Sequence, residues 1–425
     1  MPPLRPLGPL ERWFAIRHTL SYHNSVSLTF TVSLLVPLTP AAVTAALTVC
    51  LSTHAVLSVR IASDTDFQRV WPVDLSHAVV YSDADSPDLP DIALEANTGF
   101  ADAGVCWRMT VFARAQKVVL SYHHGIMDGE AGVAVVRCFV GALLAPPVPP
   151  VPSPSPPPPP PELPPPLEQQ LALSVSWRTA ASKLATLLPA WLPSWPGADL
   201  WTGPPIGLSP PFRTRIELLE LDAAVTWRVR ARCRREGTSV TALLHAAVAE
   251  GLVDKVGTGV SGSVAVSFRR FLPRGAGGAE GECVGVMASS LVHTHHPGGG
   301  VWERARGVKA TITAGLRVGP RDCKAAMLAW APDIRAHLLA QDGRRRELAF
   351  GVSNLGVVDI VGVEELVFNQ SASPVGNALD VCAVATDGSG LRAVFGWIEG
   401  VLQEEWMKDV VVRVKDILEE AAGEV

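Results

Sequence analysis

The 425-residue chain lacks the patterns of several common protein classes. No long block of lysine and arginine stands out and the formal net charge is −5, so we do not expect a nucleic acid partner. The seven cysteines are scattered without a Cys-x-x-Cys pair, which favours buried thiols in a reducing compartment over a disulfide framework or a zinc site. No Gly-x-Ser-x-Gly stretch or phosphate-binding glycine loop occurs, which disfavours a serine hydrolase and a P-loop enzyme.

Membrane-targeting patterns are also absent. Met1 to Arg17 mixes proline, arginine and glutamate with apolar residues, unlike a signal peptide. The most apolar region, Val26 to Ile61, is interrupted by Pro37 and Pro40 and suits strand, helix and strand better than a membrane span of ~20 residues. We expect a soluble, cytoplasmic monomer. A peripheral contact with endoplasmic reticulum or lipid droplets through Leu10 to Leu20 stays open as an alternative.

A proline-rich run divides the chain. At 425 residues, the chain is long enough for about two domains. Residues 146–166 are almost all proline, which lacks an amide donor and cannot join a sheet or helix. We predict an N-terminal lobe over residues 1–145, a linker over 146–166 and a C-terminal lobe over 167–425. A ligand for a partner's aromatic groove is the alternative to a plain spacer.

Both halves alternate between β-branched and alanine-rich segments, which predicts an α/β chain with mixed sheets. Strands are expected over residues 25–36, 57–61, 105–113, 118–123, 213–221, 262–268, 348–353, 365–369, 379–385 and 391–398. Helices are expected over residues 40–51, 130–144, 167–188, 222–236, 240–252, 301–316, 322–339 and 403–420.

The most informative stretch is residues 121–129, Ser-Tyr-His-His-Gly-Ile-Met-Asp-Gly. It follows a predicted strand and precedes a predicted helix, so His124 falls in the turn between them. A positioned imidazole near neutral pKa is the commonest general base in proteins. Asp128 can cap the helix or pair with an arginine, and Gly129 permits a close backbone approach. The plainer alternative is an ordinary polar histidine at a strand end.

The motif resembles a known signature. His123-His124-Gly125-Ile126-Met127-Asp128-Gly129 is similar to the His-His-x-x-x-Asp-Gly signature of the CoA-dependent acyltransferase superfamily, which includes chloramphenicol acetyltransferase and condensation domains. Further stretches resemble the fungal alcohol acetyltransferase family: Arg5 to Arg12, Arg17-His18, Tyr22 to Asn24, Thr238 to Ala247, and Ser353 to Gly356.

The resemblance implies a fold, an activity and residue roles. The fold would be two-lobed and chloramphenicol-acetyltransferase-like, with a substrate channel between the lobes. The enzyme would transfer acetyl from acetyl-CoA, a co-substrate, to an alcohol, without a bound cofactor, metal or covalent intermediate. His124 would be the general base, with His123, Asp128 and Gly129 in support. Asp128 would pair with Arg269 or Arg270, although two solvated arginines at a strand end remain an alternative.

Several alternatives remain open. The Asp-Phe-Gly-Trp-Gly stretch of plant relatives is not reproduced, and Val394 to Ile398 suits a core strand instead. The oxyanion donor is unassigned, with Ser353 and Asn354 as candidates. An amine acceptor, a carrier-bound acyl donor and a non-catalytic binding protein are the functional alternatives. A metal at the histidines of residues 293–296 is disfavoured, because no nearby carboxylate or cysteine supports it.

Overall fold

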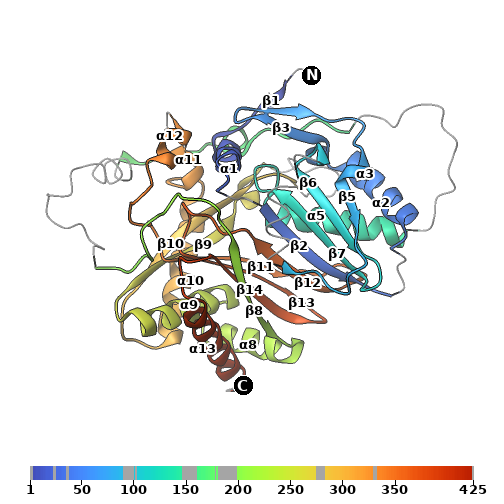
Figure 1. Cartoon of the computed structure of the whole chain (residues 1–425). Helices are drawn as coiled ribbons and strands as arrows, with labels where there is room; N and C mark the ends of the chain where they lie inside the picture. Colours follow the sequence, from blue (N-terminus) through green and yellow to red (C-terminus); the bar gives the residue numbers. More distant parts are fainter. Residues whose placement is uncertain are drawn as a thin grey trace, which may run out of the picture.

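The computed structural model describes residues 3–22, 25–34, 38–89, 100, 103–145, 160–177, 179, 199–273, 283–328 and 333–423. Two mixed sheets with helices packed against them make up the body of the molecule (Figure 1). The predicted α/β class with mixed sheets is therefore confirmed. Within the described ranges, no helix combines the length and the apolar character needed to cross a membrane.

The first sheet has five strands in the order β12-β2-β7-β6-β5. Its strands are β2 (Ser25–Val32), β5 (Val79–Tyr81), β6 (Trp107–Phe112), β7 (Lys117–His123) and β12 (Val363–Gln370). Helices α2 (Pro40–Thr53) and α5 (Gly129–Leu144) pack together, and α5 also packs on β2. The central strands β2 and β7 are buried along most of their length, so this sheet forms the first core.

The second sheet has six strands in the order β10-β9-β11-β13-β14-β8. Its strands are β8 (Thr214–Leu221), β9 (Val260–Ser267), β10 (Ala288–His295), β11 (Phe350–Val357), β13 (Leu379–Thr386) and β14 (Gly390–Ile398). Helices α8 (Ala223–Arg235), α9 (Val240–Val256), α10 (Val301–Val318) and α13 (Glu404–Gly423) pack against it and one another (Figure 1). Val394 to Ile398 lie in β14, where Phe395 and Trp397 are buried as expected for a core strand.

The division of the chain at residues 146–166 does not separate the two sheets. Strand β12 lies far beyond that run, yet it pairs antiparallel with β2, placing Phe368 opposite Leu28. It also contacts β13 and β14 of the second sheet. Both the strand propensity and the apolar faces of β12 suit either sheet, so local sequence alone could not assign it.

The first helix, α1 (Pro9–Thr19), follows β1, which belongs to a small three-stranded sheet of order β1-β4-β3. These strands are β1 (Pro3–Pro6), β3 (Val59–Ser63) and β4 (Asp66–Arg69). At the start of α1, Glu11 accepts hydrogen bonds from the Gly8 amide at 2.7 Å and from Arg5 at 2.7 and 2.8 Å. Leu10, Trp13 and Ile16 are buried. The apolar side of this helix is therefore packed inside the protein.

Two predicted helices are interrupted. The helix predicted over residues 167–188 begins with α6 (Leu167–Gln170) and is broken at Ser174, which bridges to Arg321. Trp177 and Thr179 are again helical, and residues 178 and 180–188 lie outside the described ranges. The helix predicted over 322–339 consists of α11 (Lys324–Leu328) and α12 (Ile334–Leu339), both in contact with α1. At the end of the proline run, the Pro164 carbonyl accepts a hydrogen bond from Arg5 Nε at 2.9 Å.

Two glycines of α5 provide a matched test of its packing. A methyl group on Gly132 would lie 2.8 Å from Cζ of Tyr122 and 2.9 Å from Cδ1 of Leu28, whereas one on Gly141 would meet nothing within 4 Å. Gly132→Ala should therefore lower the free energy of unfolding by about 1–3 kcal/mol through overpacking. Gly141→Ala should raise it by about 0.5–1 kcal/mol, because alanine favours a helix interior. Urea unfolding of both variants measures the difference, and equal effects would contradict this packing.

Candidate active site

The motif occupies the turn between β7 and α5. Strand β7 ends at His123, and Asp128 is the N-cap of α5, accepting a hydrogen bond from the Ala131 amide at 3.0 Å. The buried Tyr122 hydroxyl donates to the Asp128 carbonyl at 3.0 Å. The strand, the turn and the first turn of the helix are thus bonded to one another, which holds the backbone around His124.

Asp128 joins this turn to the second sheet. Its carboxylate accepts hydrogen bonds from Arg269 Nη1 and Nη2 at 2.8 and 2.9 Å, and from the Met287 amide at 2.8 Å. Burial alone would raise the pKa of Asp128, but the charge and hydrogen bonds of Arg269 outweigh it, and the pKa lies below its usual value. Asp128 is therefore an ionised carboxylate with both oxygens engaged.

The His124 ring is half-buried and held at one edge and one face. Its Nδ1 lies 3.2 Å from the Met127 carbonyl oxygen, and Phe14 of α1 stacks on it with ring centroids 4.0 Å apart and planes at 15°. Because a carbonyl only accepts, this bond assigns the proton of the neutral ring to Nδ1 and the lone pair to Nε2. Burial lowers the pKa of His124 below 6.5, so the ring is mainly neutral at pH 7.

His123 has the opposite tautomer and a different place. It is 3% exposed, and its Nδ1 accepts a hydrogen bond from the Gly125 amide at 2.8 Å. Its ring contacts His18 edge-on at a centroid distance of 4.6 Å. Burial is the main cause that places the pKa of His123 well below its usual value. The ring therefore supports the turn as a neutral group.

A cavity of about 210 Å³ lies at His124. Its wall combines His124, Asp128 and Gly129 of the motif with Arg269, Ser353 and Asn354 of the second half of the chain. Most of the lining is apolar, including Phe14 and Leu355, whereas Ser289, Ser290 and Lys324 are polar. The imidazole thus borders a cavity built from both sheets, where a small substrate can reach it.

The remaining predicted residues are placed differently. Arg270 is exposed, whereas its neighbour Arg269 makes the paired hydrogen bonds to Asp128. The Asn354 side chain donates to Thr241 Oγ1 at 3.0 Å and accepts from the Gly356 amide at 2.8 Å. One amide proton of Asn354 is therefore already engaged on the side away from the motif.

Known proteins resemble this chain over most of its length. No family model matches it. A probable alcohol acetyltransferase of Fusarium pseudograminearum, FCK4, is 26% identical over 398 residues, covering 83% of this chain and 79% of that protein. A second, crmB of Aspergillus fumigatus, is 26% identical and covers 68% of this chain and 66% of that protein. The chain is therefore similar to proteins named as probable alcohol acetyltransferases.

Solved structures support the same fold. The TRI3 trichothecene 15-O-acetyltransferase from Fusarium sporotrichioides has a TM-score of 0.71 at 12% identity, covering 98% of this chain and 95% of that chain. The condensation domain of the Monacolin K polyketide synthase MokA has a TM-score of 0.65 at 13% identity, covering 99% and 97%. The predicted chloramphenicol-acetyltransferase-like fold is confirmed, and the curated relatives support the predicted enzyme class, a CoA-dependent acyltransferase.

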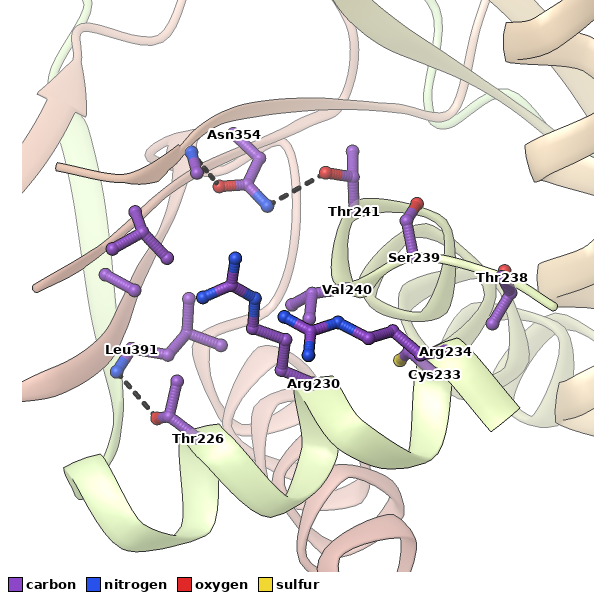
Figure 2. A pocket seen from close by; sticks show the side chains of 13 residues that line it. Thr226, Arg230, Cys233, Arg234, Thr238, Ser239, Val240, Thr241, Asn354 and Leu391 are labelled. Atoms are coloured by element: carbon purple, nitrogen blue, oxygen red, sulfur yellow. Dashed lines mark hydrogen bonds between the residues drawn. The ribbon is translucent and has the colours of Figure 1, made fainter. Parts of the chain in front are cut away.

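A second cavity of about 250 Å³ borders strand β11, which also contributes to the wall of the cavity at His124 (Figure 2). Arg230 and Arg234 of α8, and Ser239 and Thr241 at the start of α9, line it. Asn354 lines both cavities and lies between them. These two arginines were not among the predicted site residues. They lie four residues apart on α8 and therefore share one face of the helix, and this spacing was the available sequence signal.

Two buried histidines, His245 and His295, lie next to the half-buried His293 in a separate group. His245 Nδ1 lies 3.0 Å from His295 Nε2, and His293 Nδ1 lies 2.7 Å from Thr311 Oγ1. Burial lowers the pKa of His245 to about 3 and that of His295 to about 2. His296, by contrast, is exposed. In the part of the chain that is described, no group of three or more histidine, cysteine or carboxylate side chains has an arrangement that could hold a metal.

The two neighbouring arginines give a matched test of the link between the sheets. Arg269→Ala leaves the buried Asp128 carboxylate without its charge partner, so the free energy of unfolding should fall by about 3–5 kcal/mol. Arg270→Ala removes an exposed side chain and should change it by less than about 0.5 kcal/mol. Denaturant unfolding at pH 7 measures both.

The ion pair between Asp128 and Arg269 also predicts how the free energy of unfolding depends on pH. A carboxylate whose pKa is lowered by folding stabilises the protein above its unfolded pKa, and this stabilisation is lost as pH falls through the folded value. In Arg269→Ala, burial without the guanidinium raises the pKa of Asp128, so the variant takes up a proton at higher pH than wild type. The difference in unfolding free energy between wild type and Arg269→Ala should therefore shrink as the pH falls. A difference that grew on acidification would mean that Asp128 is protonated in the folded protein.

Proposed function

We propose that this protein transfers an acetyl group from acetyl-CoA to the hydroxyl of an alcohol, with His124 as the general base. The observation that carries the proposal is the Nδ1 contact with the Met127 carbonyl, which leaves the Nε2 lone pair on a ring that borders the cavity. The similarity to two probable alcohol acetyltransferases supports the same reaction class.

The proposed reaction needs one proton carrier. Nε2 of His124 removes the proton from the hydroxyl as its oxygen attacks the thioester carbon. The tetrahedral intermediate then collapses, the carbon–sulfur bond breaks, and the departing sulfur takes the proton from the imidazolium. No acyl-enzyme forms. Asp128 has both oxygens in hydrogen bonds, so its proposed role is to hold the turn.

The oxyanion of the intermediate needs a donor on the cavity wall. Ser353 and Asn354 both lie there. One proton of the Asn354 amide is engaged by Thr241. We therefore favour the Ser353 hydroxyl for this role.

The proposed binding of acetyl-CoA, the acyl donor, rests on the second cavity, which Arg230 and Arg234 line. The two arginines supply positive charge, and the start of the 17-residue helix α9 directs amide groups toward an anion. Asn354 lines both this cavity and the one at His124, and we propose that a long thioester places its phosphates at Arg230 and Arg234 and its acyl group at the imidazole. Phosphates of this kind are present in CoA.

The alternatives use the same site. An amine acceptor would be deprotonated by the same ring. A carrier-bound acyl donor is favoured by the fold shared with condensation domains, but the arginine-lined cavity favours a free CoA thioester. For a non-catalytic binding protein, the geometry of His124 would have no purpose. We also propose a reducing cytoplasmic setting, because all seven cysteines are free thiols.

Replacing the imidazole tests the proposed base. His124→Ala should lower turnover by about 10²- to 10⁴-fold, because one proton-transfer group is lost. Its unfolding temperature should stay near that of wild type, since the ring is half-buried and makes one 3.2 Å contact to the backbone. Release of free thiol from acetyl-CoA, over a panel of alcohols and amines, measures turnover and ranks the acceptors.

The pH dependence is the internal control of that experiment. Because burial lowers the pKa of His124, the acid limb of kcat/KM should lie below pH 6.5. Turnover that survives in His124→Ala, with the same acid limb, would refute the role of this residue.

Variants of Arg230 and Arg234 test the proposed binding of acetyl-CoA. Arg230→Ala and Arg234→Ala should each raise the KM for acetyl-CoA about 10-fold, because each loses a charge-assisted contact to phosphate. The control is Arg228→Ala, an exposed arginine of the same helix that does not line the cavity.

Acetyl-pantetheine, which lacks the nucleotide phosphates, separates phosphate binding from a general loss of activity. Its KM should be the same in wild type and in all three variants. A rise in KM for both acetyl-CoA and acetyl-pantetheine would show that the arginines support the fold and do not bind the phosphates.

A further inference from the structure

One contact of the candidate base has no part in the proposed proton transfer. The Phe14 ring lies on the face of the His124 imidazole, with centroids 4.0 Å apart and planes at 15°. The two residues are far apart in sequence and come from α1 and from the turn before α5. Both line the cavity of about 210 Å³.

The imidazole is bonded to the backbone at one edge. Its hydrogen bond to the Met127 carbonyl is 3.2 Å long and lets the ring tilt about that bond. A ring stacked on one face opposes the tilt and also keeps water from that face. In water a histidine side chain prefers the tautomer with the proton on Nε2, so rotation away from Met127 would remove the Nε2 lone pair.

The place of Phe14 is itself well determined. The preceding residue, Trp13, is buried, with the Lys324 Nζ 4.6 Å from its ring centroid. Helix α1 contacts α11 and α12, and its first turn is held by the Glu11 bonds to Gly8 and Arg5. A rigid helix therefore presents the phenyl ring to the imidazole.

We propose that Phe14 is a positioning residue that holds His124 against the Met127 carbonyl and so keeps its proton on Nδ1 and its lone pair on Nε2. This inference rests on the proposed function, because it concerns the same base. It acts through His124, and no bond of Phe14 to a substrate is required.

The test reads the tautomer directly. Protein labelled with ¹⁵N-histidine is compared as wild type, Phe14→Leu and Phe14→Tyr at about pH 8, with His124→Gln used to assign the signals. Wild type and Phe14→Tyr should show His124 with the proton on Nδ1. Phe14→Leu, which keeps the apolar character but removes the ring, should show a mixture rich in the Nε2 tautomer. His123, whose Nδ1 accepts from Gly125, should keep its proton on Nε2 in all three.

Activity gives a second, separate readout. Turnover of Phe14→Leu should fall by about 10- to 100-fold, and Phe14→Tyr should retain most of it. Unchanged nitrogen spectra and turnover in Phe14→Leu would overturn the inference, as would a wild-type His124 protonated on Nε2. A tyrosine variant that behaves like the leucine variant would also overturn it. If wild type transfers no acyl group, the proposed function fails, but the nitrogen spectra still decide whether Phe14 holds the imidazole.

Discussion

The candidate site depends on the ion pair between Asp128 and Arg269. The carboxylate is 4% exposed at its side chain and takes hydrogen bonds from the guanidinium, from the Met287 amide and from the first turn of α5. A buried charge is tolerated only when such bonds replace water. The pair therefore requires the turn of the first sheet and the end of β9 in the second sheet to stay together. The cavity at His124 exists because they do.

The two histidines of the motif show how the backbone selects a tautomer. His124 meets a carbonyl at Nδ1, whereas His123 meets an amide at the same atom. One ring therefore keeps its lone pair on Nε2, and the other keeps a proton there. Both rings have lowered pKa values because of burial, yet only the first borders the cavity. Adjacent residues of one type thus have different chemistry, decided by which backbone group each one faces.

Much of this could be predicted from local patterns. The alternation before the motif predicted β7, and the small apolar residues after it predicted α5, because the periods of strand and helix are local properties. The core strand at Val394 to Ile398 followed from the same reasoning. The sheet of β12, the choice of Arg269 over Arg270 and the cavity at Arg230 could not be predicted in this way. Each depends on residues more than a hundred positions apart meeting in space.

By itself, the sequence determined the α/β class, the strand-turn-helix around His124 and the resemblance to CoA-dependent acyltransferases, since these depend on residue types at short, regular spacing. Only the tertiary structure decided which arginine meets Asp128, which ring covers the imidazole and which nitrogen of His124 keeps its lone pair. The physical reason is that these interactions are directional. A hydrogen bond or a ring stack requires particular atoms to approach within a few ångströms at a given angle. For Arg269 and Phe14 that geometry arises only when distant segments pack together, and for the bond between His124 and Met127 it depends on the exact conformation of the turn.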